Sequence, residues 1–213
     1  MTSWHVESVV GSATELHGRE LPAERTVWTF QPSEPAVVLG STQPASVVRA
    51  GAGIEVVRRR SGGGAVLLVP GEVLWVDVVV PRHDVLWDDD VGRATHWLGE
   101  LWVRALTRCG VTGATVHTGA MVCRPWSKLV CFAGLGPGEV SLGERKAVGI
   151  SQRRTRAGAR FQCALYHRWD PTALVAVLAD PRPSADELAG SVAEIDVPLG
   201  DVQAALLAEL ALV

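Results

Sequence analysis

Residues 58–66 read RRRSGGGAV, three arginines that run directly into a serine and three glycines. Glycine lets the backbone approach a ligand closely, and a guanidinium group binds carboxylate or phosphate oxygens through paired hydrogen bonds. The stretch lacks the Gly-Lys-Ser/Thr that a P-loop needs and the Gly-x-Gly-x-x-Gly of dinucleotide-binding folds. It therefore predicts an anion-binding loop of another kind, with a plain strand connection flanked by solvated arginines as the alternative.

The segments around this loop predict short strands and separate helices. Alternating or β-branched runs predict strands over residues 26–31, 36–39, 65–68 and 73–80. Three aspartates at 88–90 suit the start of a helix, because apolar residues then recur at helical spacing as far as residue 105. This mixture indicates the α+β class. The remaining expected elements are strands of a second, smaller sheet at 129–133, 147–150 and 161–166, and helices at 171–178 and 202–212.

Bulk composition narrows the possible functions. A length of 213 residues with 47% hydrophobic and 20% charged residues suits one packed domain. The formal net charge of -3 offers no electrostatic footprint for nucleic acid or an anionic membrane. The cysteines form no Cys-x-x-Cys pair, the histidines lack metal-ligand spacing, and neither a secretion signal nor a membrane-length apolar run is present. We therefore expect a cytoplasmic protein with free thiols and no metal, nucleic-acid or membrane partner.

Lysine is rare, which makes its positions informative. Of 20 Lys and Arg residues, only Lys128 and Lys146 are lysines. Residues 146–154 read KAVGISQRR, a strand-like run that ends in polar and basic residues. Strict alternation places Lys146 on one face with Val148 and Ile150. A lysine beside two apolar residues either snorkels at a sheet edge or points into a pocket, and the pattern alone favours snorkelling.

Together, residues 58–66 and 146–154 resemble the catalytic domain of lipoate-protein ligases and their octanoyltransferase relatives. Residues 35–43 and the Cys131-Phe132-Ala133 segment match further family motifs in the same order. The resemblance implies one α+β catalytic domain over residues 1–213, without a C-terminal accessory domain. Its expected core is a mixed, strongly curved β-sheet with flanking helices plus a smaller second sheet, around a bifurcated pocket for a medium-chain acyl group and a nucleotide.

The resemblance also assigns roles to residues. Lys146 is the expected catalytic residue, bridging the acid carboxylate and the α-phosphate so that two anions can approach each other. The backbone amides of the glycine loop would hold oxygens as preorganised donors, and Arg59 would bind phosphate. The full set of expected nucleotide- and acyl-binding residues is Arg58, Arg59, Ser61, Gly62, Gly63, Gly64, Ala65, Gly149, Ser151, Gln152 and Arg154.

The implied activity is ATP-dependent conversion of lipoate or octanoate to the acyl-adenylate, followed by transfer to a lysine. ATP with Mg²⁺ and the acid are then substrates, and no permanently bound cofactor is expected. The implied partner is a lipoyl carrier domain of a 2-oxoacid dehydrogenase or the glycine cleavage H protein. An acyl carrier protein or a separate polypeptide that supplies an accessory domain are further partners.

Three other functions remain open from the sequence. An octanoyltransferase takes its acyl group from acyl carrier protein without ATP, and Cys131 is then the candidate nucleophile, 15 residues before Lys146, whose charge favours a thiolate. A buried, inert Cys131 between two apolar residues is the alternative that the pattern favours. Biotin ligation and a non-catalytic ligand-binding relative complete the set. Leu67, Leu68 and Val69 replace a polar family run, and Cys163 stands where the family often has histidine.

Overall fold

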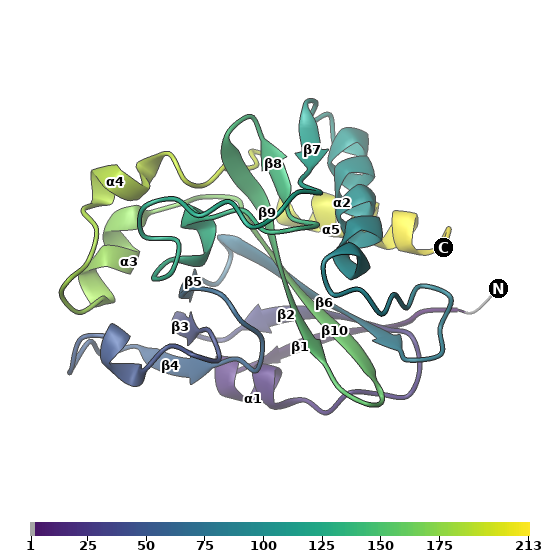
Figure 1. Ribbon diagram of the computed structural model, residues 1–213, viewed down its shortest axis with the longest axis horizontal. Coiled ribbons are helices and arrows are strands. Elements are labelled where there is room, and N and C mark those ends of the chain that lie inside the picture. The colour runs from purple at the N-terminus through teal and green to yellow at the C-terminus, as the bar shows by residue number, and fades with distance from the viewer. Residues whose placement is uncertain (1–2) are drawn as a thin grey trace.

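The computed structural model describes residues 3–213 as two β-sheets with five α-helices around them (Figure 1). The large sheet has the order β1-β2-β6-β10-β9-β8-β7, and the small sheet has the order β4-β3-β5. The pairs β1–β2 and β3–β4 are parallel, and the other pairs are antiparallel. The strands are β1 (His5–Gly11), β2 (Thr26–Pro32), β3 (Ala36–Leu39), β4 (Glu55–Arg58), β5 (Val66–Leu68), β6 (Val73–Pro81), β7 (Ala114–Val116), β8 (Val140–Leu142), β9 (Arg145–Arg154) and β10 (Gly158–Tyr166).

The large sheet is covered differently on its two faces. The α-helices are α1 (Ala13–Gly18), α2 (His96–Arg108), α3 (Pro171–Val177), α4 (Ala185–Ala189) and α5 (Leu199–Leu210). Because side chains alternate along a strand, Val76, Val78 and Val80 of β6 pack with α2 and α5, whereas Trp75 and Val79 pack with the small sheet. The space between the two sheets holds the candidate site. No helix within residues 3–213 has the length and apolar character that a bilayer crossing requires.

The predicted α+β class with a large and a small sheet is confirmed. The predicted strands of the first third are present, as are strands over 147–150 and 161–166 and helices α3 and α5. The position of the small sheet was predicted wrongly. It is built from β3, β4 and β5, whereas β9 and β10 pair with β6 and complete the large sheet. Periodicity predicts that a segment is extended, and long-range pairing decides which sheet it joins.

Two local predictions were also wrong. Residues 129–133 form no strand: the N–H groups of Leu129 and Val130 both donate to Trp126 O, and Cys131–Ala133 is a 3-10 turn. Trp126 itself has a φ of 68°, which bends the chain sharply. The aspartates at 88–90 do not begin α2, because Asp90 instead accepts from the N–H groups of the preceding turn, at positions 92 and 93.

Candidate active site

The glycine loop between β4 and β5 is held in shape by Arg59. Its Nε and Nη2 donate to Gly62 O at 3.2 and 2.7 Å, Nη2 donates to Gly64 O at 2.9 Å, and Nη1 donates to Val38 O at 3.3 Å. The side chain is buried, with 4% of its surface exposed. The N–H groups of Arg59 therefore mostly donate to carbonyl groups of the loop itself. Binding of a phosphate by this guanidinium stays a prediction.

Two positions of this loop require glycine, one for lack of room for a side chain and one for its backbone conformation. A Cβ atom on Gly64 would lie 2.7 Å from the backbone of Val130 and Cys131, and Gly63 has a φ of 101°. The close approach is fixed by hydrogen bonds from Ala65 N to Leu129 O and from Cys131 N to Ala65 O, at 2.7 and 3.0 Å. The glycine loop and the Cys131 segment, far apart in sequence, are thereby joined along their backbones.

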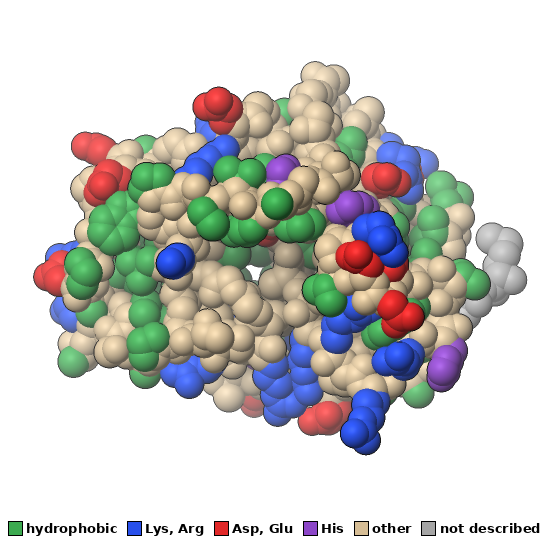
Figure 2. All heavy atoms as spheres, viewed as in Figure 1, with side chains coloured by type: hydrophobic (Ala, Val, Ile, Leu, Met, Phe, Trp, Pro, Cys, Tyr) green, Lys and Arg blue, Asp and Glu red, His purple; other side chains and the backbone are tan. Residues whose placement is uncertain are grey.

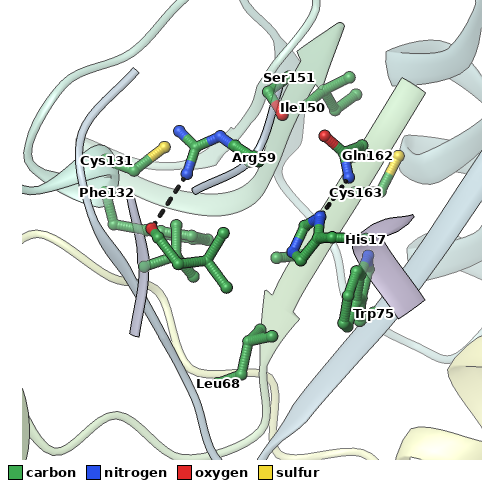
Figure 3. Close-up of a pocket in the computed structure, with 14 residues that line it drawn as sticks. His17, Arg59, Leu68, Trp75, Cys131, Phe132, Ile150, Ser151, Gln162 and Cys163 are labelled. Atoms are coloured by element: carbon green, nitrogen blue, oxygen red, sulfur yellow. Dashed lines mark hydrogen bonds between the residues drawn. The ribbon is translucent and has the colours of Figure 1, made fainter. Parts of the chain in front are cut away.

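A narrow, mostly apolar pocket lies between the two sheets, and we call it the inner pocket (Figure 3). In the close-up, His17, Gln162 and Trp75 lie on one side, and Arg59 and Cys131 lie on the other. An apolar lining with a few polar groups is typical of a small-molecule site. The residues that line it are His17, Val38, Arg59, Val66, Leu68, Trp75, Cys131, Phe132, Gly149, Ile150, Ser151, Gln162, Cys163 and Ala164.

A second, wider cavity, the outer groove, opens beside the inner pocket. The surface is hollowed near the middle of the view in Figure 2. The groove shares Cys131, Ile150 and Ser151 with the inner pocket, so the two cavities meet at these residues. Its lining residues are Gly62, Gly63, Gly64, Val91, Gly92, Thr95, Met121, Ser127, Cys131, Gly136, Pro137, Glu139, Lys146, Ile150, Ser151 and Gln152.

Cys131 lies where the two cavities join. It begins the 3-10 turn and is half-buried, whereas Val130 and Phe132 on either side are buried. The predicted full burial of Cys131 is therefore wrong, because the residue packs beside the core but is half-buried and lines both cavities. The reactivity of its thiol stays a prediction. Cys163 also lines the inner pocket, but burial strongly raises the pKa of its thiol and keeps it neutral.

Lys146 points into the site and does not snorkel. Its Nζ lies 2.7 Å from Glu139 Oε2 and donates to Cys131 O at 2.8 Å, and only 2% of the residue is exposed. The expected alternation fails because β9 carries a bulge: Val140 pairs with Val148 and Ser141 pairs with Lys146, so Ala147 has no opposite residue. The extra residue turns Lys146 away from the face that Val148 occupies.

Glu139 is a site residue that sequence reasoning missed. Its carboxylate accepts from the N–H of Gly136 at 2.5 Å and from the N–H of Ile150 at 3.1 Å, in addition to its ion pair with Lys146. The Gly-Pro-Gly-Glu sequence at 136–139 indicates a turn, but nothing in it shows that the carboxylate folds inward. The buried pair fixes the lysine beside Cys131, and it makes these two side chains electrically neutral together.

We expect Glu139→Gln to lower the free energy of unfolding by about 1–3 kcal/mol, because the amide keeps one acceptor but the buried ammonium loses its counter-charge. Urea unfolding at neutral pH measures the change. Glu144→Gln on the exposed turn of the same hairpin is the matched control and is expected to stay within about 0.5 kcal/mol of the unmodified protein. Equal values for the two variants would contradict the role of Glu139.

A polar network borders the inner pocket. Ser61 Oγ lies 2.9 Å from Ser151 Oγ and donates to Gln162 Oε1 at 2.8 Å, and Gln162 Nε2 lies 3.0 Å from His17 Nδ1. Behind it, the fully buried Asp77 forms an ion pair with the equally buried Arg160. Burial raises the pKa of Asp77, and the guanidinium of Arg160 opposes that rise. His17, Asp77, Arg160 and Gln162 carried no sequence signal as a group, because they come from three separate segments, α1, β6 and β10.

His17 is held neutral. Burial against Trp75, with ring centroids 4.4 Å apart, lowers the pKa of His17 to about 3, and the charges of Arg160 and Arg59 add to the effect. Between pH 3 and 6.5 the unfolded chain binds a proton at this ring that the folded protein does not. Stability therefore rises with pH across this window, by up to about 1.4 kcal/mol per unit, and is lost as the pH falls.

We expect His17→Gln to remove this contribution. Urea unfolding between pH 3 and 7 should show a shallower rise in stability for His17→Gln than for the unmodified protein, and parallel curves above pH 6.5. The carboxylates titrate in both proteins and cancel in the comparison. His83→Gln changes an exposed histidine and serves as the control. A His17→Gln curve parallel to the unmodified curve at all pH values would show that folding leaves the pKa of His17 unchanged.

The structure brings some of the predicted site residues together and leaves others outside. Gly62, Gly63, Gly64, Gly149, Ser151, Gln152, Cys131 and Lys146 line one or both cavities, and Ser61 contacts Ser151. Arg58 is exposed and lines neither cavity, and Ala65 contributes only its backbone to the loop. Arg154 donates to the carbonyls of Asp88 and Asp89 and lies over the Trp87 ring, so it supports the loop before α2.

Within residues 3–213, no three His, Cys, Asp or Glu side chains converge into a metal-binding group. At the junction of the two cavities the chain places one thiol, one ammonium group and the glycine loop. These groups are suited to an acyl group, because the amides can stabilise a developing oxyanion and the thiol can attack a carbonyl carbon. The fold and site together define an enzyme of the ligase and acyltransferase class.

Comparison with protein families identifies the particular family. Residues 10–211 match the model of the lipoyl protein ligase A/B catalytic domain, and the chain belongs to this family. The predicted resemblance is thereby confirmed, and with it the prediction of an enzyme. Comparison with curated protein sequences gives no match.

Three solved structures show the same fold. A lipoate-protein ligase A bound with ATP has a TM-score of 0.74 at 22% identity, with 98% of this chain and 83% of that chain covered. A bi-partite lipoate protein ligase from Thermoplasma acidophilum, studied with its E2 lipoyl domain, has a TM-score of 0.73 at 19% identity, covering 99% and 83%. A T. acidophilum protein with bound lipoic acid has a TM-score of 0.72 at 20% identity, covering 98% and 84%.

Proposed function

We propose that this protein transfers an octanoyl or lipoyl group to a lysine of a lipoyl carrier domain, with Cys131 carrying the group as a thioester. One observation carries the proposal: the Cys131 side chain lines both cavities, with Lys146 and the glycine loop beside it. The acyl chain would occupy the apolar inner pocket, and the incoming carrier would reach the carbonyl carbon through the outer groove.

The reaction has two balanced steps. The Cys131 thiolate attacks the carbonyl carbon of an acyl thioester on acyl carrier protein, the new carbon–sulfur bond forms, and the carrier leaves as a thiol after taking a proton. The amine of the target lysine then attacks the same carbon, the amide forms, and Cys131 is released as the amine loses its proton. Lys146 is a cationic group beside the Cys131 backbone, and the loop amides would serve as donors to the oxyanion in both steps.

The charges of the outer groove support this route over adenylation. Lys146 and Glu139 are its charged lining residues, and they pair with each other. A nucleoside triphosphate with Mg²⁺ needs several cationic or amide contacts. Arg58 and Arg154 lie outside the groove, and the Arg59 guanidinium is hydrogen-bonded to the carbonyls of the loop. A thioester donor brings no second anion to the reacting carbon.

ATP-dependent ligation of lipoate or octanoate is the second candidate. The separate outer groove, lined by the backbone of three glycines, favours it because such a loop can bind phosphate oxygens. In that route Lys146 would bridge the carboxylate and the α-phosphate. A bi-partite ligase shares this fold, so an accessory polypeptide is the partner that the ligase route would add.

Mass spectrometry of a lipoyl domain tests both routes. The domain is incubated with the protein and octanoyl acyl carrier protein without ATP, or with octanoate, lipoate or biotin in the presence of ATP and Mg²⁺. We expect an octanoyl mass increase in the first reaction. An increase only in the octanoate or lipoate reactions with ATP would replace the thioester route by ligation, and an increase only with biotin would overturn the lipoyl assignment.

A further inference from the structure

Strand β1 leaves one side of its backbone open. His5 N donates to Arg25 O, and Gly11 O accepts from Ser33 N. The backbone N–H and C=O groups of the odd-numbered residues of β1 therefore point toward β2. The N–H and C=O groups of Val6, Ser8 and Val10 therefore point to the other side. Within residues 3–213, these outward groups have no hydrogen-bond partner, since β1 is the first strand of the large sheet. The edge is a free template for another strand.

This edge lacks the features that usually prevent pairing. The opposite edge strand β7 has three residues, and the edge strands of the small sheet have four and three. β1 has seven residues with an unbroken register, and it contains no proline, lysine or bulge. Its Val6 and Val10 side chains are 47% and 68% exposed and lie on the same face as Ser8. An unpaired edge of this length with exposed apolar side chains is unusual in a protein that stays monomeric.

We propose that β1 pairs antiparallel with β1 of a second copy, about a two-fold axis through Ser8. In this register Val6 lies opposite the partner's Val10, Ser8 lies opposite the partner's Ser8, and each pair exchanges two backbone hydrogen bonds. The exchange needs residues whose N–H and C=O groups both point outward, and Val6, Ser8 and Val10 meet that condition. The four valines form two apolar cross-strand pairs on one face of the joined sheet.

The charge pattern selects this register. A Ser8-centred pairing places Glu7 opposite the partner's Val9, so no like charges meet. A pairing centred on Glu7 would bring it against the partner's Glu7 at the close, non-hydrogen-bonded spacing. A pairing centred on Val9 leaves Val6 without an opposite residue. The Ser8-centred register is the one that uses all three outward-facing residues, and the isologous arrangement is the usual symmetry of a homodimer.

The space around β1 is compatible with a partner strand. One groove lined by Trp4, Val6, Leu207 and Val213, and a second that includes Val10 and Leu199, separate β1 from the two ends of α5. Helix α5 therefore leaves the valines of β1 uncovered. The C-terminus lies at one end of the molecule in Figure 1, away from the centre of β1.

A charge-exchange series tests the register by light scattering coupled to size exclusion. The unmodified protein is expected at twice the mass of one chain, and Val6→Lys and Val10→Lys are each expected to raise the dimer dissociation constant at least about tenfold. The double variant Val6→Lys with Val10→Glu should recover dimer, because each introduced lysine faces an introduced glutamate across the axis. Val6→Lys with Val10→Lys should not recover. Val85→Lys, at an 89% exposed position away from β1, is the control and should leave the mass unchanged.

Hydrogen exchange of the unmodified protein gives a second readout that needs no variant. Dilution below the dissociation constant should speed exchange at the amides of Val6, Ser8 and Val10, and leave those of Glu7 and Val9 slow. A single-chain mass at all concentrations, or a dimer that survives Val6→Lys and Val10→Lys, would overturn the proposal. The test does not depend on acyl transfer, so it stands or fails separately from the proposed function.

Discussion

Replacement of Cys131 by alanine is expected to abolish transfer of an octanoyl group from acyl carrier protein to a lipoyl domain, with a loss of roughly a thousandfold or more. The sulfur is the atom that would hold the acyl group at the junction of the two cavities, and alanine offers no substitute. Intact-protein mass spectrometry after quenching in acid measures the other half of the prediction. The unmodified protein should carry one octanoyl group, labile to hydroxylamine, that Cys131→Ala lacks.

Cys123→Ala is the matched control for this experiment. Cys123 is exposed, precedes the same segment, and lines neither cavity at the candidate site. Its replacement should leave both the covalent adduct and the transfer rate unchanged. Full activity of Cys131→Ala with ATP and free acid would transfer the assignment to the ligase route, and full activity with octanoyl acyl carrier protein would exclude a Cys131 thioester.

Replacement of Lys146 by methionine is expected to lower the rate of acyl transfer by about 10² to 10³, the scale for losing one charged donor at an oxyanion. Methionine keeps much of the side-chain length, so the loss would come from the ammonium group beside Cys131. Single-turnover transfer from the preformed octanoyl thioester to a lipoyl domain measures the chemical step. Lys128→Met changes the other lysine, which is exposed, and should have no effect.

The Lys146 variant needs a second control, because it leaves the Glu139 carboxylate buried without its partner. The double variant Lys146→Met with Glu139→Gln removes both charges and should recover stability lost by the single variant. If the double variant has the same free energy of unfolding as the unmodified protein and still transfers slowly, the loss of rate comes from the missing ammonium group and not from loss of stability. Normal transfer by a folded Lys146→Met protein would remove Lys146 from the mechanism.

Local sequence predicted much of the fold and the main chemical groups. Alternating or β-branched runs predicted β2, β3, β5 and β6. Strands that are buried on both faces consist mainly of apolar residues, so they are recognisable from sequence. The glycine run predicted an anion-binding loop, and that role stays a prediction. The structure shows that Gly64 lies against the backbone of residues 130–131. Cys131 and Lys146 were both named as candidates, although their predicted environments were wrong. The Cys131 thiol lines both cavities, and the Lys146 side chain lies inside.

The errors share a physical cause. A one-residue bulge reverses the face of Lys146, and period-two counting cannot detect an extra residue that only the pairing with β8 defines. Glu139 and His17 contribute through partners that are far away in sequence, Lys146 and Ile150 for the first and Gln162 and Trp75 for the second. Such contacts leave no periodic pattern.

The sequence by itself determined the residue types for the chemistry: a glycine loop, one thiol and one rare lysine, each in a short motif. Only the tertiary structure decided that these motifs meet, since backbone pairing of residues 65 and 131 and the buried Glu139–Lys146 ion pair join segments across the fold. Local propensity acts over a few residues, whereas a site at the junction of two cavities depends on which strands pair and in which register.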